Sequence, residues 1–322
     1  MYDIIAIGSG MRDVFLLSDQ FRLIANADFE GGKAECVALG SKIEVNDIVL
    51  TTGGGATNAA VTFARLGLKT AAICRIGDDA GGRDVIEDLK KEGVATALIR
   101  RVAKGVTGYS TLLTASNGER TALTYRGVSG TLGSADVPFA KCKARWFYVT
   151  SLAGNVALAR KIATHAKSSG ASVAWNPGRK EIEQGLGAIK AILPNVRVLQ
   201  LNKEEAARLT GASTVEEMFA ALATPGNVVV ITDGARGAFV QRDGITIMSP
   251  GSGRQAVSQT GAGDAFGSGF VAGLMRTDDL RTALAVGMLN AQSVITKVGA
   301  KAGILKKWPT NVQLKSVNIA KV

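Results

Sequence analysis

The chain has 322 residues, of which 46% are hydrophobic and 20% are charged, enough for one large α/β domain with a small appendage or for two ordinary domains. The formal net charge of +11 suits an anionic partner, such as nucleic acid, an acidic membrane or a phosphorylated small molecule. Because the basic residues are dispersed and only 5% of the residues are aromatic, a solvated basic surface is favoured over a nucleic-acid site.

The first residues and the cysteines argue against export. The chain carries an acid at its third position and breaks its first apolar run at Gly8, whereas a secretory signal needs a basic flank and a longer apolar core. No segment approaches the ~18 consecutive apolar residues of a membrane span. Cys36, Cys74 and Cys142 are odd in number and lack metal-type spacing, which favours neither a disulfide framework nor a zinc site. We therefore expect a cytoplasmic protein.

Apolar runs typical of strands alternate with helix-like stretches over most of the chain. The predicted strands span residues 3–8, 70–76, 146–150, 172–175, 196–201 and 228–232. Predicted helices include 58–66 and 84–92, each followed by a glycine, Gly67 or Gly93, at the position of a C-terminal cap. This alternation predicts βαβ units and a mostly parallel sheet buried between helices.

Two segments interrupt the alternation. Residues 107–126 contain two β-prone runs joined by Asn117-Gly118, a strong hairpin signal, and residues 14–51 combine polar turns with a β-like stretch. We expect both to form a small β-sheet lid over the carboxyl edge of the main sheet, where it would exclude water from a reaction centre. The alternative is a purely structural surface sheet. The predicted main domain comprises residues 1–13, 52–106 and 127–322.

The first motif with chemical content is the run from Gly53 to Gly67, which begins Gly-Gly-Gly-Ala-Thr-Asn. Three glycines allow a ligand to approach the backbone closely, and Asn58 offers both a donor and an acceptor at a helix start, as polyol recognition requires. A loop in which Asn58 only caps the helix is the alternative.

The second motif, Asn202-Lys203-Glu204-Glu205, follows a predicted strand and opens a helix. An Asn followed three residues later by a Glu is the pattern of reciprocal helix capping, which needs no further function. Oxygen ligands at the carboxyl end of a strand also suit hydrated Mg²⁺, which binds through few carboxylates together with phosphates and waters. Both interpretations stay open.

The third motif, Thr232-Asp233-Gly234-Ala235-Arg236-Gly237, follows the most apolar predicted strand. A glycine-containing turn at this place is typical of a nucleotide contact. It is equally typical of a short turn with no ligand.

The strongest local signal runs from Thr260 to Phe270 and includes Gly261-Ala262-Gly263-Asp264. Small residues before an apolar helix let successive backbone N–H groups form an anion hole, which would stabilise charge on a transferred phosphoryl group. Asp264 falls in the first helical turn, where its carboxylate could accept a proton from an attacking hydroxyl. The alternative is an acid favoured at a helix start by the macrodipole.

Several other catalytic patterns are absent from the sequence. There is no G-x-x-x-x-G-K-[ST] phosphate loop, and the run Gly8-Ser9-Gly10-Met11-Arg12-Asp13 ends in Asp where the dinucleotide fingerprint needs Gly. The protein-kinase motifs are missing. With His165 as the single histidine, a Ser-His-Asp hydrolase or a two-His metal site is disfavoured.

Taken together, these motifs resemble the ribokinase-like (PfkB) family, and the resemblance covers about residues 1 to 305. The run from Gly53 is similar to the family's first signature, and the run from Thr260 is similar to the end of its second, with Asn202-x-x-Glu205 between them. The order and separation of the three motifs make the joint match specific. The resemblance implies a three-layer α/β sandwich with a mostly parallel central sheet flanked by helices, plus a small β-sheet lid. It also implies ATP-dependent phosphorylation of a sugar or nucleoside hydroxyl.

The resemblance also implies roles for individual residues. The implied catalytic residues are the base Asp264 and the anion-hole residues Gly261, Ala262 and Gly263. The implied substrate-binding residues are Asp13, Gly54, Gly55, Asn58 and, on the lid, Tyr125 and Arg126. The implied nucleotide-binding residues are Thr232, Gly234, Gly237 and Asn290. The residues implied to organise Mg²⁺ through water are Asn202 and Glu205.

One departure from the family pattern concerns the monovalent cation. The second signature usually begins Asp-Thr, but this chain has Ser258 and Gln259 there. In relatives activated by a monovalent cation that Asp helps to hold the ion, so we do not expect potassium dependence.

Three alternatives to a sugar kinase are kept. One is a nucleoside kinase of the same fold, which needs a pocket for a base. Another is a non-catalytic, ligand-binding family member, against which the retention of Asp264, Asn202 and Glu205 argues. The third, nucleic-acid binding through the basic surface, would show salt-sensitive retention on DNA. The expected partners are a small-molecule substrate and a second copy bound through the lid, with neither nucleic acid nor membrane.

Overall fold

The computed structural model describes residues 1–29, 32–115 and 120–322. In this part of the chain nine strands form the main sheet, in the spatial order β17-β16-β15-β14-β13-β12-β11-β1-β6. The parallel strands are β1 (Tyr2–Ile7), β6 (Thr70–Ile73), β11 (Ala144–Val149), β12 (Ser172–Trp175), β13 (Val198–Asn202) and β14 (Val228–Thr232). The predicted strands are therefore confirmed except for the second part of 70–76, and their apolar runs fit a sheet that is covered on both faces.

The remaining strands of the main sheet are antiparallel. They are β15 (Gly237–Arg242), β16 (Ile245–Pro250) and β17 (Ala320–Lys321). The predicted strand 70–76 is broken at Cys74, because the chain leaves the main sheet there. Its second part, β7 (Arg75–Gly77), pairs with β8 (Arg100–Val102) in a separate two-stranded sheet.

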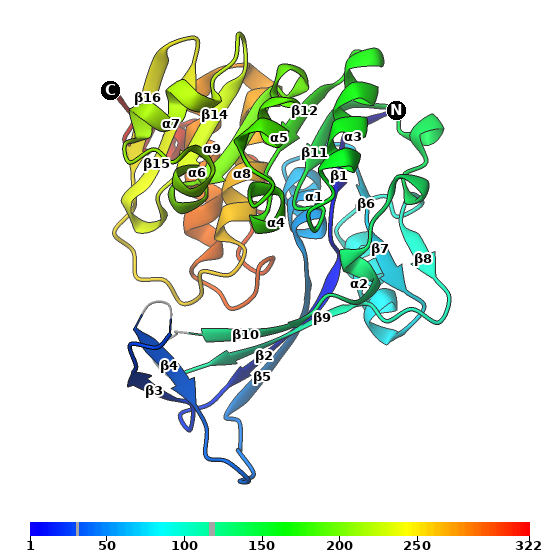
Figure 1. Cartoon of the computed structure of the whole chain (residues 1–322), viewed down its shortest axis with the longest axis vertical. Helices are drawn as coiled ribbons and strands as arrows, with labels where there is room; N and C mark the ends of the chain where they lie inside the picture. The colour runs from blue at the N-terminus through cyan, green and yellow to red at the C-terminus, as the bar shows by residue number, and fades with distance from the viewer. Residues whose placement is uncertain (30–31, 116–119) are drawn as a thin grey trace.

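Helices cover both faces of the main sheet (Figure 1). The helices packed on one face are α1 (Gly55–Arg65), α2 (Ala80–Lys91), α8 (Ala262–Thr277) and α9 (Leu280–Val294). The helices of the other face are α3 (Val156–Ser168), α4 (Arg179–Ile182), α5 (Leu186–Lys190), α6 (Lys203–Thr210) and α7 (Val215–Leu222), and the short helix α10 (Asn311–Lys315) follows near the end of the chain. Two separate hydrophobic cores therefore lie on the two sides of the sheet, which makes the predicted three-layer sandwich. None of the described helices combines the length and apolar character that a membrane crossing requires.

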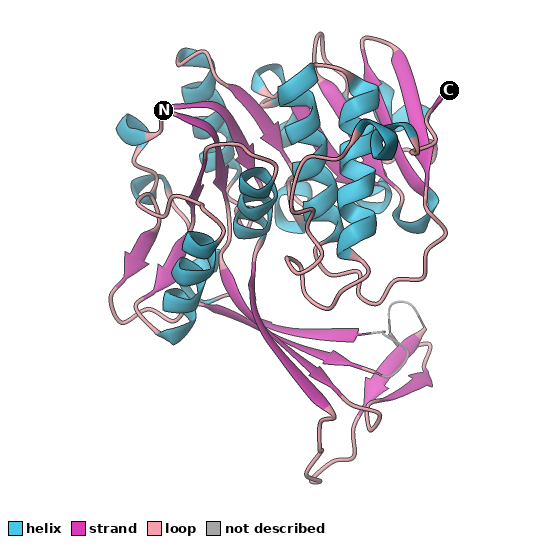
Figure 2. Ribbon diagram, turned by 180° about the vertical axis from the view of Figure 1, so that it is seen from behind, coloured by secondary structure: helices cyan, strands magenta, loops and turns pink. Residues whose placement is uncertain are grey.

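A second, four-stranded sheet projects from the sandwich (Figure 2). It contains β2 (Met11–Leu17), β5 (Asp47–Gly53), β9 (Gly108–Thr114) and β10 (Arg120–Tyr125), in the order β10-β9-β2-β5. The small pair β3 (Arg22–Ala25) and β4 (Lys33–Cys36) lies at its far end. The small sheet is thus confirmed, while the turn Asn117-Gly118 lies outside the described residues.

The lid strands begin and end at the site. β2 starts at Met11, directly after β1, and β5 ends at Gly53, directly before α1. The predicted domain limits at residues 13–14 and 51–52 therefore fall inside these two strands and stay a prediction. The start of β2, the end of β5, the start of α1 and the start of α8 therefore lie together at the carboxyl edge of the parallel sheet.

Candidate functional site

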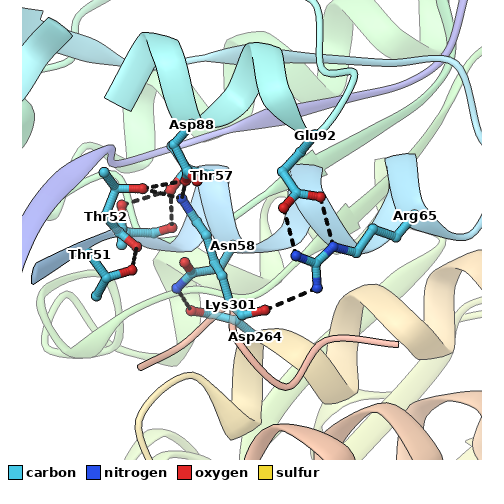
Figure 3. A network of polar contacts seen from close by, with 11 residues as sticks. Thr51, Thr52, Thr57, Asn58, Arg65, Asp88, Glu92, Asp264 and Lys301 are labelled. Carbon is cyan, nitrogen blue, oxygen red and sulfur yellow. Dashed lines mark hydrogen bonds and ion pairs between the residues drawn. The ribbon is translucent and has the colours of Figure 1, made fainter. Parts of the chain in front are cut away.

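Asp264 and Asn58 form the centre of the candidate site. Nδ2 of Asn58 donates a hydrogen bond of 2.8 Å to Oδ2 of Asp264, across 206 positions of sequence (Figure 3). Asn58 is buried in α1, and its Oδ1 has no partner in the described part of the chain. Burial raises the pKa of the Asp264 carboxyl, and the Asn58 hydrogen bond opposes that rise. The pair therefore offers a proton acceptor and an open acceptor oxygen side by side, as a hydroxyl substrate needs.

The start of α8 provides backbone donors beside Asp264. Gly261 caps the helix in the left-handed conformation, with φ of +81°. The N–H of Ala262 donates to the carbonyl of Gln259 within this turn. The N–H groups of Gly261, Gly263 and Asp264 have no acceptor among the described residues, and the side of Gly263 where a Cβ would stand faces open space. Within the described residues, the start of α8 therefore presents three unpaired backbone N–H groups that an anion hole could use, while the N–H of Ala262 is already paired.

Asp13 lies in lid strand β2 and is 7% exposed. Desolvation raises the pKa of its carboxyl to about 6, although the nearby charge of Lys301 and a hydrogen bond from Ser110 act in the opposite direction. Asp264 is close enough to add to the rise. The two carboxyl groups thus lie close enough for the charge of Asp264 to act on Asp13.

The glycines of the first motif are required by close packing around Asp13 and the strand ends. A Cβ on Gly53 would collide with the carboxylate of Asp13, and one on Gly54 (φ +98°) would collide with the backbone of Ser9. A Cβ on Gly55 would collide with Thr150, directly after β11. The glycines thus bring the start of α1 against the ends of β1 and β11, which aims Asn58 at Asp264.

The structure separates the two predicted lid residues. By strand pairing, Tyr125 stands opposite Tyr109, and Tyr109 stands opposite Arg12, the neighbour of Asp13. Because side chains alternate along a strand, Tyr125 lies on the face of the lid away from Asp13, where it is 59% exposed. Arg126 follows β10 and lines a small cavity that Ser9 and Ser151 also line. Arg126 therefore stays beside the site, and Tyr125 does not.

Asn202 and Glu205 form the reciprocal cap. Oδ1 of Asn202 accepts from the N–H of Glu205 at 2.8 Å, and Oε2 of Glu205 accepts from the N–H of Asn202 at 2.9 Å. Burial raises the pKa of Glu205. The described residues include neither a donor to Oε1 of Glu205 nor a group of three His, Cys, Asp or Glu side chains suited to direct metal binding. These oxygens therefore fit a hydrated Mg²⁺ held through water.

The loop after β14 is held by charge pairs that sequence reasoning did not single out. The carboxylate of Asp233 accepts two hydrogen bonds from Arg236, of 2.8 and 2.6 Å, and Nζ of Lys203 lies 3.4 Å away. Gly234 and Gly237 have φ of +55° and +111°, values that favour glycine. This turn presents backbone groups next to the start of α6.

Asn290 lies in a buried hydrogen-bond network. It is fully buried, its Nδ2 donates to the carbonyl of Ala265 at 2.8 Å and to Thr62 at 3.2 Å, and its Oδ1 accepts from the N–H of Leu305 at 3.0 Å. All its hydrogen-bonding groups are used in tying α9 to α8, α1 and the C-terminal segment. These contacts make Asn290 a support of α8, and its place in a nucleotide pocket stays a prediction.

Three buried polar residues of the site carry no motif. In the central strands, Nε2 of Gln200 donates to the carbonyl of Gly263 at 3.0 Å, and the hydroxyl of Tyr148 lies 3.4 Å from Oε1 of Gln200. Lys301, in the loop after α9, is 5% exposed and reaches the root of the lid. A polar residue inside an apolar strand is a signal that could have identified Gln200, because such a residue needs a partner.

A larger hollow of about 560 Å³ separates the far part of the lid from the sandwich. Leu17, Ser18 and Thr114 line it on the lid side, and residues 255–257 with Val298 line it on the other side. Asp13 and Asp264 do not line it, so it is the space between lid and body beyond the centre of the site.

Comparisons with known proteins agree with this geometry. A family model described as "pfkB family carbohydrate kinase" matches residues 7–307. The ribokinase of Haemophilus influenzae is 31% identical over 271 residues, which cover 80% of this chain and 85% of that protein. The ATP-dependent ribose-1-phosphate kinase of Halopiger xanaduensis is 29% identical over 237 residues, which cover 72% and 76%. A nucleoside kinase of Methanothermobacter thermautotrophicus is 26% identical over 260 residues, which cover 78% and 81%.

Solved structures share the fold. One from E. coli, provisionally named Ribokinase II and determined with ATP and Mg²⁺, superposes with a TM-score of 0.78 at 20% identity, covering 94% of this chain and 96% of that chain. At this identity the likeness concerns the fold alone.

Proposed function

Since this chain belongs to the pfkB family and is an ATP-dependent carbohydrate kinase, we propose that Asp264 is the general base that accepts the proton of the sugar hydroxyl during phosphoryl transfer. The observation that carries this proposal is the contact between Asn58 and Asp264, which joins the two signature motifs in one site. A base must lie within hydrogen-bond reach of the hydroxyl that it deprotonates. The open Oδ1 of Asn58 and the carboxylate of Asp13 would hold neighbouring hydroxyls of the same sugar.

The transferred phosphoryl group would bind at the start of α8. The N–H groups of Gly261, Gly263 and Asp264 would bind its oxygens, and the positive end of the helix dipole adds to that stabilisation. Mg²⁺ bound with ATP would neutralise phosphate charge, and Asn202 with Glu205 would orient its waters. The turn at Thr232, Gly234 and Gly237 would contact the nucleotide. A monovalent cation is not part of the proposed site, since Ser258 supplies a neutral hydroxyl there.

For the substrate we propose a sugar that has no attached base and carries a carboxylate or a phosphate. Arg126 is the exposed cation beside the site, and a guanidinium can hold either anion with two parallel hydrogen bonds. A relative that phosphorylates ribose 1-phosphate supports this class. Tyr125 lies on the opposite face of the lid, so the described lid strands provide little for stacking a nucleobase.

The experiment is a coupled ADP-release screen over neutral sugars, sugar acids, sugar phosphates and nucleosides. Acidic or phosphorylated sugars should give the highest kcat/KM, and Arg126→Ala should remove that preference with little loss on neutral sugars. A nucleoside as the best substrate would instead support the nucleoside-kinase alternative, which a related nucleoside kinase favours. ATP binding without turnover of any acceptor would support the non-catalytic alternative.

We also propose that two copies associate through the outer face of the lid. Ile48 and Leu50 of β5 lie on the same face as Leu123 and Tyr125 of β10, and each is more than half exposed. Such an apolar sheet face is unusual on a monomer. Sedimentation should show a dimer that Leu50→Asp converts to a monomer, whereas a monomeric native protein would refute the proposal.

A further inference from the structure

Lys301 is a buried cation that the reaction as described does not use. Its side chain is 6% exposed, and Nζ donates to Oγ1 of Thr52 at 2.6 Å and to Oδ2 of Asp88 at 2.8 Å. Oγ1 of Thr52 in turn donates to the same carboxylate oxygen at 2.5 Å. Figure 3 shows this network next to Asn58 and Asp264. A charge buried in this way costs free energy unless it is paired, so its retention needs an explanation.

The network of Lys301, Thr52 and Asp88 lies next to two parts of the site, the end of lid strand β5 and the start of α8. Thr52 precedes Gly53, whose backbone packs on the carboxylate of Asp13. On the other side of the lysine, Ala300 packs against Gly261 at the start of α8, so closely that a Cβ on Gly261 would collide with it. The carbonyl of Lys301 accepts a hydrogen bond of 3.1 Å from Arg65 of α1. Lys301 and its neighbour Ala300 thus connect the end of lid strand β5, helix α1 and the start of α8.

Few charges face the carboxylate of Asp13. From the loop after α9 it faces Lys301, from α8 it faces Asp264, and from its own strand it faces Arg12. Ser110 of β9 donates a hydrogen bond to it, and Thr51 of β5 stands opposite it in the sheet. Arg12 is paired with Asp84 of α2 at 2.6 Å. Among these groups Lys301 gives the strongest stabilisation of the ionised Asp13.

Lys301 is itself surrounded by groups that keep it charged. Asp88 of α2 is its ion-pair partner, and Asp13 also faces it. The buried thiol of Cys74 faces it too, but burial raises the pKa of that thiol to about 12, so it stays neutral. Burial lowers the pKa of the Lys301 ammonium, and Asp88 is the largest opposing influence. The side chain of Asp88 is 34% exposed, so this counter-ion is less deeply buried than the lysine that it pairs with.

We propose that Lys301 is a positioning residue for substrate binding. Its buried ammonium keeps Asp13 ionised, and its hydrogen bond to Thr52 fixes the end of lid strand β5 beside the sugar site. An ionised Asp13 accepts hydrogen bonds from sugar hydroxyls, whereas a protonated one loses part of that capacity. This inference rests on the proposed role of Asp13 as a hydroxyl ligand. It extends that role, since the lysine sets the pH range in which the sugar binds.

The test measures sugar affinity by calorimetry between pH 5.5 and 8.5, without ATP, with the best acceptor from the screen. Lys301→Met and Lys301→Gln both remove the charge, and Gln keeps a donor for Thr52 and Asp88. Loss of a nearby opposite charge should raise the pKa of Asp13 by about one unit. The decrease of sugar affinity at low pH, here called the acid limb, should then move upward by about one pH unit. The affinity at pH 6 should fall about fivefold. At pH 8.5 the affinity should return nearly to that of the native protein.

Two controls separate charge from structure. Thr52→Val removes the hydroxyl but keeps the ion pair of Lys301 with Asp88, so it should lower the melting temperature and leave the acid limb in place. Lys306→Met removes an exposed lysine five residues further on and should change neither. A Lys301 variant whose affinity is reduced equally at every pH, or whose acid limb does not move, would overturn the inference.

Asp13→Asn separates this inference from the proposed function. If Asp13 binds the sugar, this variant should weaken binding at pH 8.5 and remove the acid limb. An unchanged affinity would refute the role of Asp13 itself. Weakened binding in Asp13→Asn together with a fixed acid limb in both Lys301 variants would refute only the role of the lysine.

Discussion

At the residue scale, the first prediction concerns Asp264, the proposed general base. Asp264→Asn should lower kcat by about 10²- to 10⁴-fold, because removal of a general base has effects of that size, while the affinity for ATP should persist. Single-turnover rates and nucleotide titration measure the two effects. Asp243→Asn is a matched control, because Asp243 is exposed in a turn at φ +50°, which Asn tolerates. Near-normal turnover of Asp264→Asn would remove Asp264 from the base role.

Glu205 allows a second test at this scale, since it caps α6 and is proposed to organise Mg²⁺. Glu205→Gln keeps the shape and one acceptor oxygen of the cap. If the carboxylate acts on the metal's waters, the Mg²⁺ concentration for half-maximal activity should rise severalfold. A loss of stability on the order of 1 kcal/mol with an unchanged Mg²⁺ response would instead show a cap alone. Thr214→Ala, which removes the analogous cap of α7, should lower stability and leave the Mg²⁺ response unchanged.

The sequence allowed some of these residues to be predicted and not others. Asp13, Asn58 and Asp264 lie in or next to glycine-rich runs, so their motifs are visible locally, and the structure brings them together. Lys301 and Gln200 were missed because their significance comes from partners more than 50 positions away. The hydrogen bonds of Asn290 could not be predicted, because an amide in an apolar helix satisfies a buried network as readily as a ligand.

At the element scale, the position of α8 depends on a glycine inside the helix. A Cβ on Gly267 would collide with the side chains of Gln200 and Tyr148, which lie beneath the start of the helix. Gly267→Ala should therefore shift α8, destabilise the protein by roughly 1–3 kcal/mol and lower kcat more than it raises the KM for the sugar. Gly187→Ala in α5, where a Cβ meets open space, should be neutral or slightly stabilising. Chemical denaturation and steady-state kinetics give both quantities, and equal behaviour of the two variants would contradict the packing argument.

The loop before α8 gives a prediction about ions. Ser258 is buried, and its hydroxyl accepts from the N–H of Thr260 at 3.3 Å. A neutral hydroxyl in place of a carboxylate should bind a monovalent cation weakly. We expect equal rates in potassium chloride and in a bulky organic chloride at the same ionic strength. Severalfold activation by potassium would show that other oxygens build a cation site.

The order of elements was predictable because the strands are uninterrupted apolar runs and the helices end at glycines. The division of the segment 70–76 into β6 and β7 was not predictable, because it depends on pairing with β8, about 25 residues further on. The lid was recognised by its loss of alternation, yet the face of the lid on which Tyr125 lies was not predictable. Its side depends on register across three strands, and register is invisible in a single sequence.

At the scale of the whole molecule, the site should reduce stability. The folded pKa of Asp13, about 6, exceeds its ordinary value of 3.8, so ionised Asp13 costs about 3 kcal/mol above pH 6. That cost shrinks as the pH falls below about 6 and is lost only below the ordinary pKa of 3.8, where the carboxyl is protonated in both states. Asp13→Asn should therefore be more stable than the native protein at pH 8, with the difference reduced to about a third near pH 4.5. Urea denaturation at the two pH values measures this, and an equal difference at both would contradict it.

The contact between Asn58 and Asp264 also has a consequence for biosynthesis. Asp13 and Asn58, the proposed ligands of the sugar hydroxyls, are translated early. Asp264 and Lys301 come from the last fifth of the chain. Because long-range contacts form only after the intervening chain has been made, a nascent or truncated polypeptide ending before α8 lacks the base. With Asp264 as the proposed base, competence to transfer phosphate therefore arises only once α8 has been made, and chains that end before α8 cannot consume ATP in this way.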